Sequence, residues 1–297
     1  MASASSVPVP SSHLDAARDA EPATRAANAA MAAKLPFADT ADFEAAKRGL
    51  IATVPEGIVR TGGGTVLWNL GEYAFIDGEL APDTVNPSLW RIARLNLANG
   101  LFRVTDRLYQ LRGFDIANLT VIEGDSGLIL IDPLTTAEVS RAALDLYYAH
   151  RPRKPVVAVI YTHSHVDHFG GALGVLSAEE VAARNVPVVA PIGFMEEATS
   201  ENLLVGMAMA RRSIYMYGKR LPRSPEGLID NGLGKAVAYG KVGILQPTLV
   251  VKEAKETHVL DGLEFMFHNV PGSEAPSEFV FYLPTLKAFG SAELFGH

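Results

Sequence analysis

Thr162-His163-Ser164-His165-Val166-Asp167-His168 is the stretch of this 297-residue chain that decides its fold and its chemistry. It follows the apolar, β-branched run 156–161 and leads directly into Gly170-Gly171. A strand that ends in this stretch presents three histidines and an aspartate at its exit, where a tight turn can direct them toward one point. Neutral imidazoles and a carboxylate are the ligands expected for zinc or another first-row divalent metal. A polar loop after a buried strand is the alternative, but this spacing rarely arises by chance.

The stretch also resembles a known signature. Thr-His-Ser-His-Val-Asp-His-Phe-Gly-Gly, residues 162–171, is similar to the metal-binding motif of the metallo-β-lactamase superfamily. The resemblance implies an α/β (α+β) chain folded as an αββα sandwich, with metals at the edge of its sheets. Flavodiiron members of the superfamily typically carry Glu at the position of His165 and bind iron, so the resemblance favours zinc.

Composition bounds the remaining possibilities. A hydrophobic content of 48% in 297 residues is enough for a full-sized core. The net charge is −7 and the densest basic cluster is only 151–154, which argues against a nucleic-acid surface. Cysteine is absent, so a zinc site would use nitrogen and oxygen ligands. No stretch approaches the roughly 18 to 20 apolar residues of a membrane span. The N-terminus does not resemble a secretion signal, so we expect no membrane partner and a cytoplasmic location.

The first part of the chain predicts little packed structure. We expect residues 1–54 to be an N-terminal arm, partly disordered. The stretch 13–34 is too poor in large apolar residues to bury a face, so it is either a solvated arm or a frayed helix. Asp39 or Thr40 could cap a short helix through Lys47. Gly62-Gly63-Gly64 predicts a flexible turn, since no Gly-Lys-Ser/Thr follows to make a phosphate loop. Residues 65–100 look loop-like, with packing anchors at Trp68, Tyr73, Phe75 and Trp90.

We expect the catalytic domain to span 55–297 and its core to begin near Leu101. Strand-like runs cover 102–111, 119–123 and 128–131. Thr135 and Glu138 fit a capping box that opens a helix to about His150, and Ser177 with Glu180 fits a second one. A further strand is predicted at 186–190. Strand, helix and strand in succession argue for an α/β arrangement.

The second half of the chain predicts a long helix, a loop and a second sheet. The helical pattern covers 193–217 and carries Met195, Met207, Met209 and Met216; such a helix is more often core than an adaptable wall for an apolar ligand. Five glycines within 227–243 predict a long loop over the site. Strands of the second sheet are expected at 249–251, 257–260, 263–270 and 279–283.

Asp132 ends the apolar run Leu-Ile-Leu-Ile-Asp-Pro. Taken alone, it reads equally well as a residue that terminates a strand before proline. The superfamily resemblance implies that an Asp here hydrogen-bonds near the metal ligands, orienting one of them. We therefore expect Asp132 to act in the site together with Asp167.

Two glutamates complete the predicted site. Glu274 lies in Pro-Gly-Ser-Glu-Ala-Pro, residues 271–276, and Glu293 follows nineteen residues later in Ser-Ala-Glu. Without further information both would be surface residues, because isolated glutamates are usually solvated. Glu at both positions resembles the alkyl sulfatases that hydrolyse detergents such as dodecyl sulfate. That resemblance implies one zinc held by His163, His165 and Glu274, a second held by Asp167 and His168, and Glu293 as the bridge between them.

The resemblance extends over 55–293, including Asn-Pro-Ser-Leu-Trp at 86–90 and Met-Tyr-Gly at 216–218. It implies zinc-dependent hydrolysis of a small-molecule alkyl sulfate ester to alcohol and sulfate at a site with two metal ions. Metal coordination lowers the pKa of water to about 7, which supplies a nucleophile at neutral pH. Whether the carbon–oxygen or the sulfur–oxygen bond breaks stays open. So do two alternatives: another hydrolase of the superfamily, such as a lactonase, thioesterase or lactamase, and an inactive metal-binding fragment.

The chain departs from the alkyl sulfatase pattern at its end. In that family the Ala-Glu motif is followed by Thr-x-His-Asn, an arginine that grips sulfate and a further histidine ligand, whereas this sequence ends at Gly296-His297. His297 comes too soon after Glu293 to be that histidine. We therefore expect a sandwich that is incomplete at its C-terminal end. The resemblance also implies a homodimeric full-length protein, with a dimerisation region and a sterol-carrier-like domain absent from these 297 residues.

Overall fold

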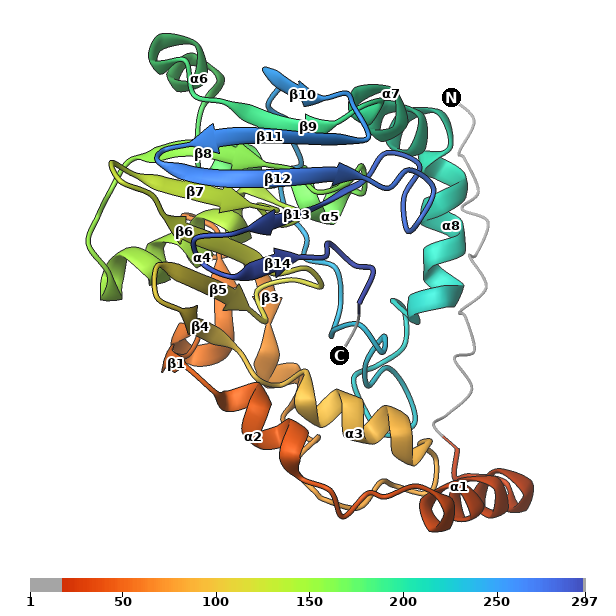
Figure 1. Cartoon of the computed structure of the whole chain (residues 1–297). Coiled ribbons are helices and arrows are strands. Elements are labelled where there is room, and N and C mark those ends of the chain that lie inside the picture. The colour runs from red at the N-terminus through yellow and green to blue at the C-terminus, as the bar shows by residue number, and fades with distance from the viewer. Residues whose placement is uncertain (1–17, 296–297) are drawn as a thin grey trace, which may run out of the picture.

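The computed structural model describes residues 18–295. Residues 1–17 of the predicted arm, and His297, lie outside the described residues. Two β-sheets lie face to face, and helices flank the larger one (Figure 1). The sequence expectation of an α/β sandwich is confirmed.

The large sheet has the order β1-β4-β5-β6-β7-β8-β9-β10, with the bounds Leu50–Ala52, Gly100–Thr105, Leu108–Arg112, Leu119–Glu123, Leu128–Ile131, Val156–Ile160, Val188–Pro191 and Leu249–Val251. The small sheet has the order β11-β12-β13-β14, with the bounds Lys255–Leu260, Leu263–Asn269, Phe279–Leu283 and Ala288–Gly290. A separate ribbon pairs β2 with β3, at Ile58–Arg60 and Val66–Asn69.

The α-helices α1 to α8 are Pro22–Lys34, Ala41–Lys47, Pro87–Leu95, Ala137–His150, Val166–Phe169, Ala178–Arg184, Phe194–Thr199 and Gly206–Tyr217. Short 3-10 turns lie at Pro55–Gly57, Leu70–Tyr73 and Ala172–Gly174, and a π-helical turn lies at Ser200–Leu204. No helix among residues 18–295 is both long and apolar enough to cross a membrane.

Strand β7 shows how the sequence builds the two layers of core. Leu128 and Leu130 pack into the cluster on the side of α4, whereas Ile129 and Ile131 pack into the cluster between the sheets. All four are buried, because alternate side chains of a strand point to opposite faces and both faces of this strand are covered. Full burial of each such side chain contributes about 1.5–3 kcal/mol. This buried strand holds Asp132 rigidly at its carboxyl end.

The two predicted capping boxes have different outcomes. At α6, Ser177 and Glu180 make both reciprocal hydrogen bonds, so that prediction is confirmed. At α4 the helix is present, but the capping box is wrong: the N-cap is Thr136, with no side-chain cap. Glu138 instead accepts a hydrogen bond from the backbone N–H of Lys241, which ties the glycine-rich loop to the start of the helix.

The folded core begins earlier in the chain than the sequence suggested. Strand β1 pairs with β4 at the edge of the large sheet, and Val54 and Val59 belong to the core beside α4. The expectation that 65–100 is loop-like is wrong, because this segment contains β3 and α3. Asn86 caps α3 through its side chain and Pro87 occupies the first turn. Asn followed by Pro is a common start of a helix, so residue preferences alone indicate this helix. Trp68 and Trp90 are buried anchors, as predicted.

Two strand assignments need correction. The run 102–111 is a hairpin of β4 and β5 rather than one strand; it turns at Asp106-Arg107, where Arg107 has a φ of 69°. The strand at 249–251 belongs to the large sheet, parallel to β9, and not to the second sheet. Its apolar composition fits either sheet, so only the tertiary structure assigns it.

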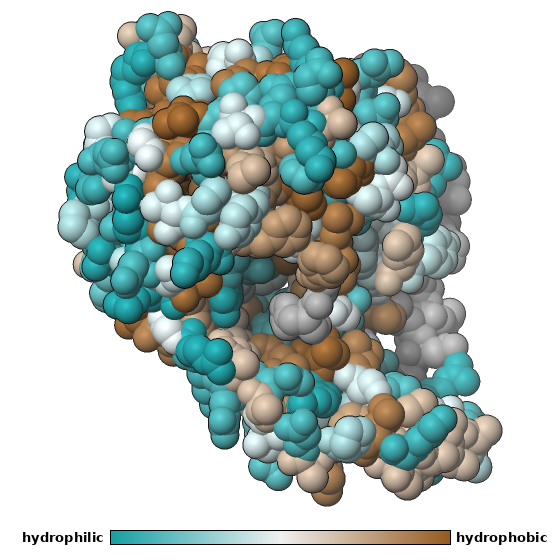
Figure 2. Space-filling view, viewed as in Figure 1, coloured by the Kyte–Doolittle hydropathy of each residue, from teal (hydrophilic) through white to brown (hydrophobic). Residues whose placement is uncertain are grey.

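The outer face of the small sheet is open. Met266, Tyr282 and Phe289 lie side by side across β12, β13 and β14, and all three are exposed. No helix of the described chain lies over this face in Figure 1, and its apolar side chains are scattered among polar ones in Figure 2. The sandwich formed by residues 18–295 therefore lacks its second outer helical layer, as the expectation of an incomplete αββα fold implied.

Asp115 joins three segments beneath the edge of the sheets. Its carboxylate accepts hydrogen bonds from the backbone N–H groups of Ile116, Thr135 and Ala238, each 2.8 Å long. Burial raises the pKa of Asp115 to about 6, even though these hydrogen bonds act in the opposite direction. The Asp132–Thr135 turn and the glycine-rich loop are both fixed by this one side chain.

We predict that Asp115 makes the free energy of unfolding decrease as the pH rises from about 4 to about 6. Below pH 4 the group is protonated in both states, and above pH 6 the folded protein must bury the charge. A shift of about two units corresponds to about 3 kcal/mol. Urea denaturation of the wild type and Asp115→Asn across this range should show a difference between them that changes by up to that amount. Asp106→Asn, in the exposed hairpin turn, is the control, and a wild-type-minus-D115N difference independent of pH would contradict the assignment.

Candidate metal centre

The histidine-rich stretch is placed by the end of β8 and a single turn of helix. After β8 the chain continues extended through His165 and then forms α5. Gly170 and Gly171 let this turn approach the Asp132–Thr136 segment, because a Cβ on either would lie 2.2 Å or less from the backbone oxygens of Thr135 or Pro133. The close approach brings Asp167 and His168 back over the strand ends.

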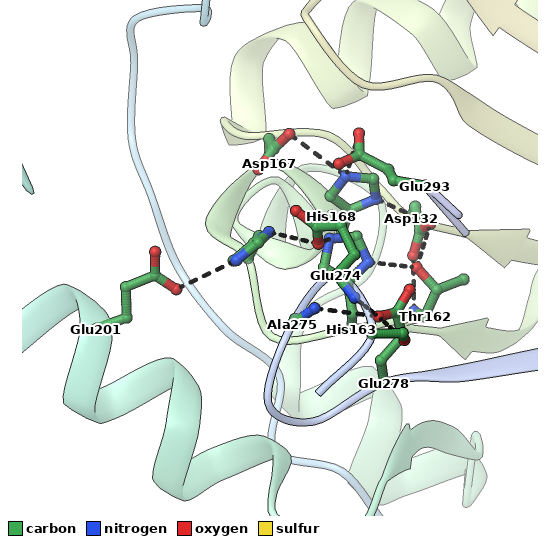
Figure 3. Close-up of polar contacts among 12 residues, drawn as sticks. Asp132, Thr162, His163, Asp167, His168, Glu201, Glu274, Ala275, Glu278 and Glu293 are labelled. Carbon is green, nitrogen blue, oxygen red and sulfur yellow. Dashed lines mark hydrogen bonds and ion pairs between the residues drawn. The ribbon is translucent and has the colours of Figure 1, made fainter. Parts of the chain in front are cut away.

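The structure brings all six predicted ligands together in two groups. One contains His163, His165, Glu274 and Glu293, and the other contains Asp167, His168 and Glu293; within each group one ligand atom per residue lies within 4.8 Å of the others. Glu293 belongs to both groups. Figure 3 shows five of these side chains converging: His163 from the stretch after β8, Asp167 and His168 from α5, Glu274 from the loop before β13 and Glu293 from the segment after β14.

The shortest contacts in the first group centre on Glu274. Its Oε2 atom lies 2.9 Å from His165 Nδ1 and 3.3 Å from His163 Nε2. In the second group, His168 Nε2 lies 3.3 Å from Asp167 Oδ2 and 3.2 Å from Glu293 Oε1. Two ligand atoms of a tetrahedral zinc ion, each about 2.1 Å from it, lie about 3.4 Å apart. Three of the four distances match the separation of ligands around such an ion.

Thr162 and Asp132 fix the protonation of two of the histidines. Asp132 accepts hydrogen bonds from the backbone N–H of Thr162 at 2.8 Å and from its hydroxyl at 2.7 Å. Since the hydroxyl proton goes to Asp132, the Thr162 oxygen accepts from His163 Nδ1 at 2.9 Å. Asp132 Oδ2 likewise accepts from His168 Nδ1 at 2.9 Å. Both histidines therefore turn Nε2 toward the centre. His163 is neutral, so its Nε2 carries a free lone pair, whereas the carboxylates of Asp167 and Asp132 raise the pKa of His168, whose Nε2 then carries a proton where no metal ion takes its place.

These two Nε2 atoms test whether the residues fit a metal ion. Both are buried and have no hydrogen-bond partner among the described residues. The lone pair of His163 Nε2 faces Oε2 of Glu274, so an acceptor faces an acceptor. His168 Nε2 lies between carboxylate oxygens of Asp167 and Glu293, which stabilise a positive charge there, whether a proton or a metal ion. The donor set fits a divalent metal.

The electrostatics of the site keep its ligands ready to bind a cation. Burial, together with the neighbouring His168 and His165, lowers the pKa of His163 to about 2, so this imidazole is neutral. Burial acts to raise the pKa of Asp167, but the charge of His168 outweighs it and holds the pKa below its usual range. Asp167 is therefore a carboxylate near neutral pH.

Sequence reasoning missed one carboxylate of the site. Glu201 lies in the π-helical turn after α7, and its Oε2 is 3.8 Å from His165 Nε2 (Figure 3). The Nδ1 atom of His165 faces Glu274, so Glu201 lies at the outer side of the ring. Glu-Asn-Leu-Leu on an exposed helix gives no sequence signal for such a role, although π-helical turns are frequent at functional sites.

A cavity of about 580 Å³ opens beside the centre, between the two sheets. Asp132, His168, Glu274 and Glu293 lie along it, and Ile122, Phe281 and Leu283 are among the apolar residues that line it. The tip of the glycine-rich loop contributes Gly232 and Leu233, in agreement with the expected loop over the site.

None of the four methionines of the methionine-rich segment is buried. The helical pattern at 193–217 is confirmed, but it is broken into α7, the π-helical turn and α8, and α8 has no buried residue. Met207 is 73% exposed. None of the four methionines lines the cavity, so their predicted role as an adaptable wall finds no contact among the described residues.

Comparison with known proteins identifies the family. Residues 112–275, more than half of the chain, match the metallo-beta-lactamase superfamily, and the chain belongs to that superfamily. Within it, the chain is 49% identical over 280 residues to a linear primary-alkylsulfatase of Pseudomonas sp., covering 94% of this chain and 42% of the relative. It is 52% identical over 279 residues to an (R)-specific secondary-alkylsulfatase of Pseudomonas sp., covering 93% of this chain and 42% of the relative.

A solved structure agrees. The chain superimposes with a TM-score of 0.88 and 51% identity on a stereoselective inverting sec-alkylsulfatase from Pseudomonas sp., covering 92% of this chain and 43% of the other. The chain spans about two fifths of the length of these relatives. The predicted similarity to alkyl sulfatases is confirmed.

We predict that Asp132→Asn weakens metal binding about 10- to 100-fold, the usual range for loss of a partner that orients a ligand. Asparagine suits the left-handed backbone at this position, where φ is 53°. Its amide cannot accept all three hydrogen bonds that the carboxylate accepts, so His168 loses its fixed tautomer. Competition with a chromophoric chelator would measure the affinity, with Asp145→Asn on the exposed face of α4 as the control. Affinity within twofold of wild type would contradict this role.

Proposed function

We propose that this chain carries the metal centre of an enzyme that hydrolyses alkyl sulfate esters, such as dodecyl sulfate, to alcohol and sulfate. The observation that carries the proposal is the pair of ligand groups sharing Glu293, each with a buried histidine Nε2 that has no hydrogen-bond partner among the described residues. The substrate class is supported by the printed names of the relatives, which are alkylsulfatases at about 50% identity.

Zinc is the metal that the donor set favours. The ligands are imidazole nitrogens and carboxylate oxygens, and the ligand separations suit a tetrahedral ion. We assign His163, His165 and Glu274 to one ion, Asp167 and His168 to the second, and Glu293 to both. With Glu293 shared, these six residues fill seven of the eight positions around two tetrahedral ions. A position is left for water or substrate, as in catalytic zinc sites.

Two metal ions at this centre would lower the pKa of a bound water to about 7 and offset the negative charge of the sulfate group. The residues of the chain prepare the centre for this chemistry. Asp132 and Thr162 hold the imidazoles of His163 and His168 in the metal-binding tautomer. Asp167 stays ionised, which makes it a ligand rather than a proton donor. The apolar part of the cavity beside the centre, with Ile122, Phe281 and Leu283, offers a place for an alkyl chain.

Two further expectations from the sequence, a homodimeric full-length protein and a cytoplasmic location, stay proposals. No contact of the described residues bears on either. Light scattering and cell fractionation of the full-length protein would test them.

We predict that Glu293→Ala in the full-length protein loses more metal and activity than Glu274→Ala, because a shared carboxylate serves both ions. We expect loss of one ion of two per chain and at least about a hundredfold lower rate, the upper range for such perturbations. Elemental analysis after gel filtration would count the ions. Wild-type turnover in Glu293→Ala would remove the bridging assignment, and one ion or none in the wild type would remove the proposal of two metals.

We predict that kcat/KM of the full-length protein rises severalfold for each two-carbon step in alkyl sulfate length, before levelling off. Each buried methylene adds up to about 0.8 kcal/mol. A series of octyl, decyl and dodecyl sulfates would measure this, with an aryl sulfate and a β-lactam alongside. A flat series, or faster turnover of the β-lactam, would show that the substrate class is misassigned.

A further inference from the structure

Glu278 is a buried carboxylate that the site described so far does not use. It precedes β13 and is 1% exposed. Its Oε2 atom accepts hydrogen bonds from the backbone N–H of Glu274 at 2.8 Å and from that of Ala275 at 3.0 Å. The same oxygen lies 2.7 Å from Ser273 Oγ, whose single proton is shared between it and the Val270 carbonyl at 2.6 Å. The loop that carries the metal ligand Glu274 is thus wrapped around this one oxygen, as Figure 3 shows for Glu274 and Ala275.

The loop has few other anchors. Residues 271–274 and Pro276 are exposed, and only Ala275 is buried. Gly272 has a positive φ of 76° and no heavy atom within 4 Å of where its Cβ would lie. Within the loop, the backbone hydrogen bonds run from Gly272 to Ala275 and from Ser273 to Val270. Because exposed backbone bonds of this kind exchange readily with water, the buried carboxylate is the strongest constraint on the loop.

The backbone around Glu278 is held against the histidine-rich stretch at the same time. Glu278 and His163 form an isolated antiparallel bridge. On either side of it, the N–H of Ser164 donates to Ser277 and the N–H of Phe279 donates to Thr162. One residue therefore fixes the distance between the strand end that carries His163 and the loop that carries Glu274.

We propose that Glu278 is a positioning residue that sets Glu274 opposite His163 and His165, so that retention of metal in this group depends on it. The proposal rests on the metal assignment made above. Glu278 itself contacts no other predicted ligand through its second oxygen, since Oε1 is buried without a hydrogen-bond partner among the described residues. All the hydrogen bonds that its side chain accepts from the loop are made by Oε2.

The unequal use of the two oxygens makes the proposal testable by a conservative change. Glutamine keeps an acceptor oxygen at the place of Oε2 and puts its amide at the place of Oε1, so Glu278→Gln should hold the loop. Alanine leaves the N–H groups of Glu274 and Ala275 without their acceptor, so Glu278→Ala should release it. Glu264→Gln, on the exposed face of β12, is the control for loss of a carboxylate from the same sheet.

The experiment compares these variants in the full-length protein by zinc content after dialysis, by zinc affinity from chelator competition, and by the visible absorption of the cobalt-substituted protein. We expect Glu278→Ala to bind the ion of the His163 group at least about tenfold more weakly. Glu278→Gln should stay within about threefold of wild type. The effects of Glu278→Ala and Glu274→Ala should not add in the double variant, since both act through the same ligand.

Additive losses in the double variant, or wild-type affinity in Glu278→Ala, would overturn the positioning role. If Glu278→Ala does not fold, Glu278→Asp takes its place: it keeps the charge but withdraws the oxygen by one methylene. Wild-type affinity in that variant would equally overturn the role. A wild-type protein that binds fewer than two ions would instead refute the metal assignment, so the two failures are distinguishable.

Discussion

The hydrogen bond from the Thr162 hydroxyl to Asp132 determines how the rest of the centre is arranged. Because that proton is committed, the Thr162 oxygen can only accept from His163, and Asp132 also accepts from His168. Two imidazoles are thereby held with their Nε2 atoms toward the same space. Asp132 can do this only because β7 is buried on both faces and delivers it to the sheet edge in a left-handed conformation.

The centre is assembled from segments that are far apart in the sequence. His163 and His165 follow β8, His168 lies in α5, Asp132 follows β7, Glu274 lies in the loop before β13 and Glu293 in the segment after β14. Face-to-face packing of the two sheets brings these ends together. The apolar layer between the sheets, with Phe265, Phe267 and Phe279 fully buried, is therefore also what holds the ligands at their separations.

The sandwich fold and the six candidate metal ligands could be predicted from the sequence. The histidine motif is local, so spacing alone located it, and resemblance to a family added Glu274 and Glu293, which no local pattern marks. The sheet to which 249–251 belongs could not be predicted, since an apolar run fits either sheet. The break of 193–217 into three helical pieces was missed because its apolar spacing stays helical throughout. Glu201 and Glu278 were missed because their roles arise from tertiary contacts.

Helix α8 has no buried residue, which affects how steadily the neighbouring Glu201 is held beside His165. A helix of twelve residues with no fully buried side chain is marginal in water, since tertiary packing supplies most of the stability of a short helix. We therefore expect its amides to exchange with solvent far sooner than those of α4, which buries six residues. Glu201 lies in the turn just before it. The carboxylate at the outer side of His165 would then be in place for only part of the time, and the basicity of that imidazole would fluctuate with the local unfolding of the helix.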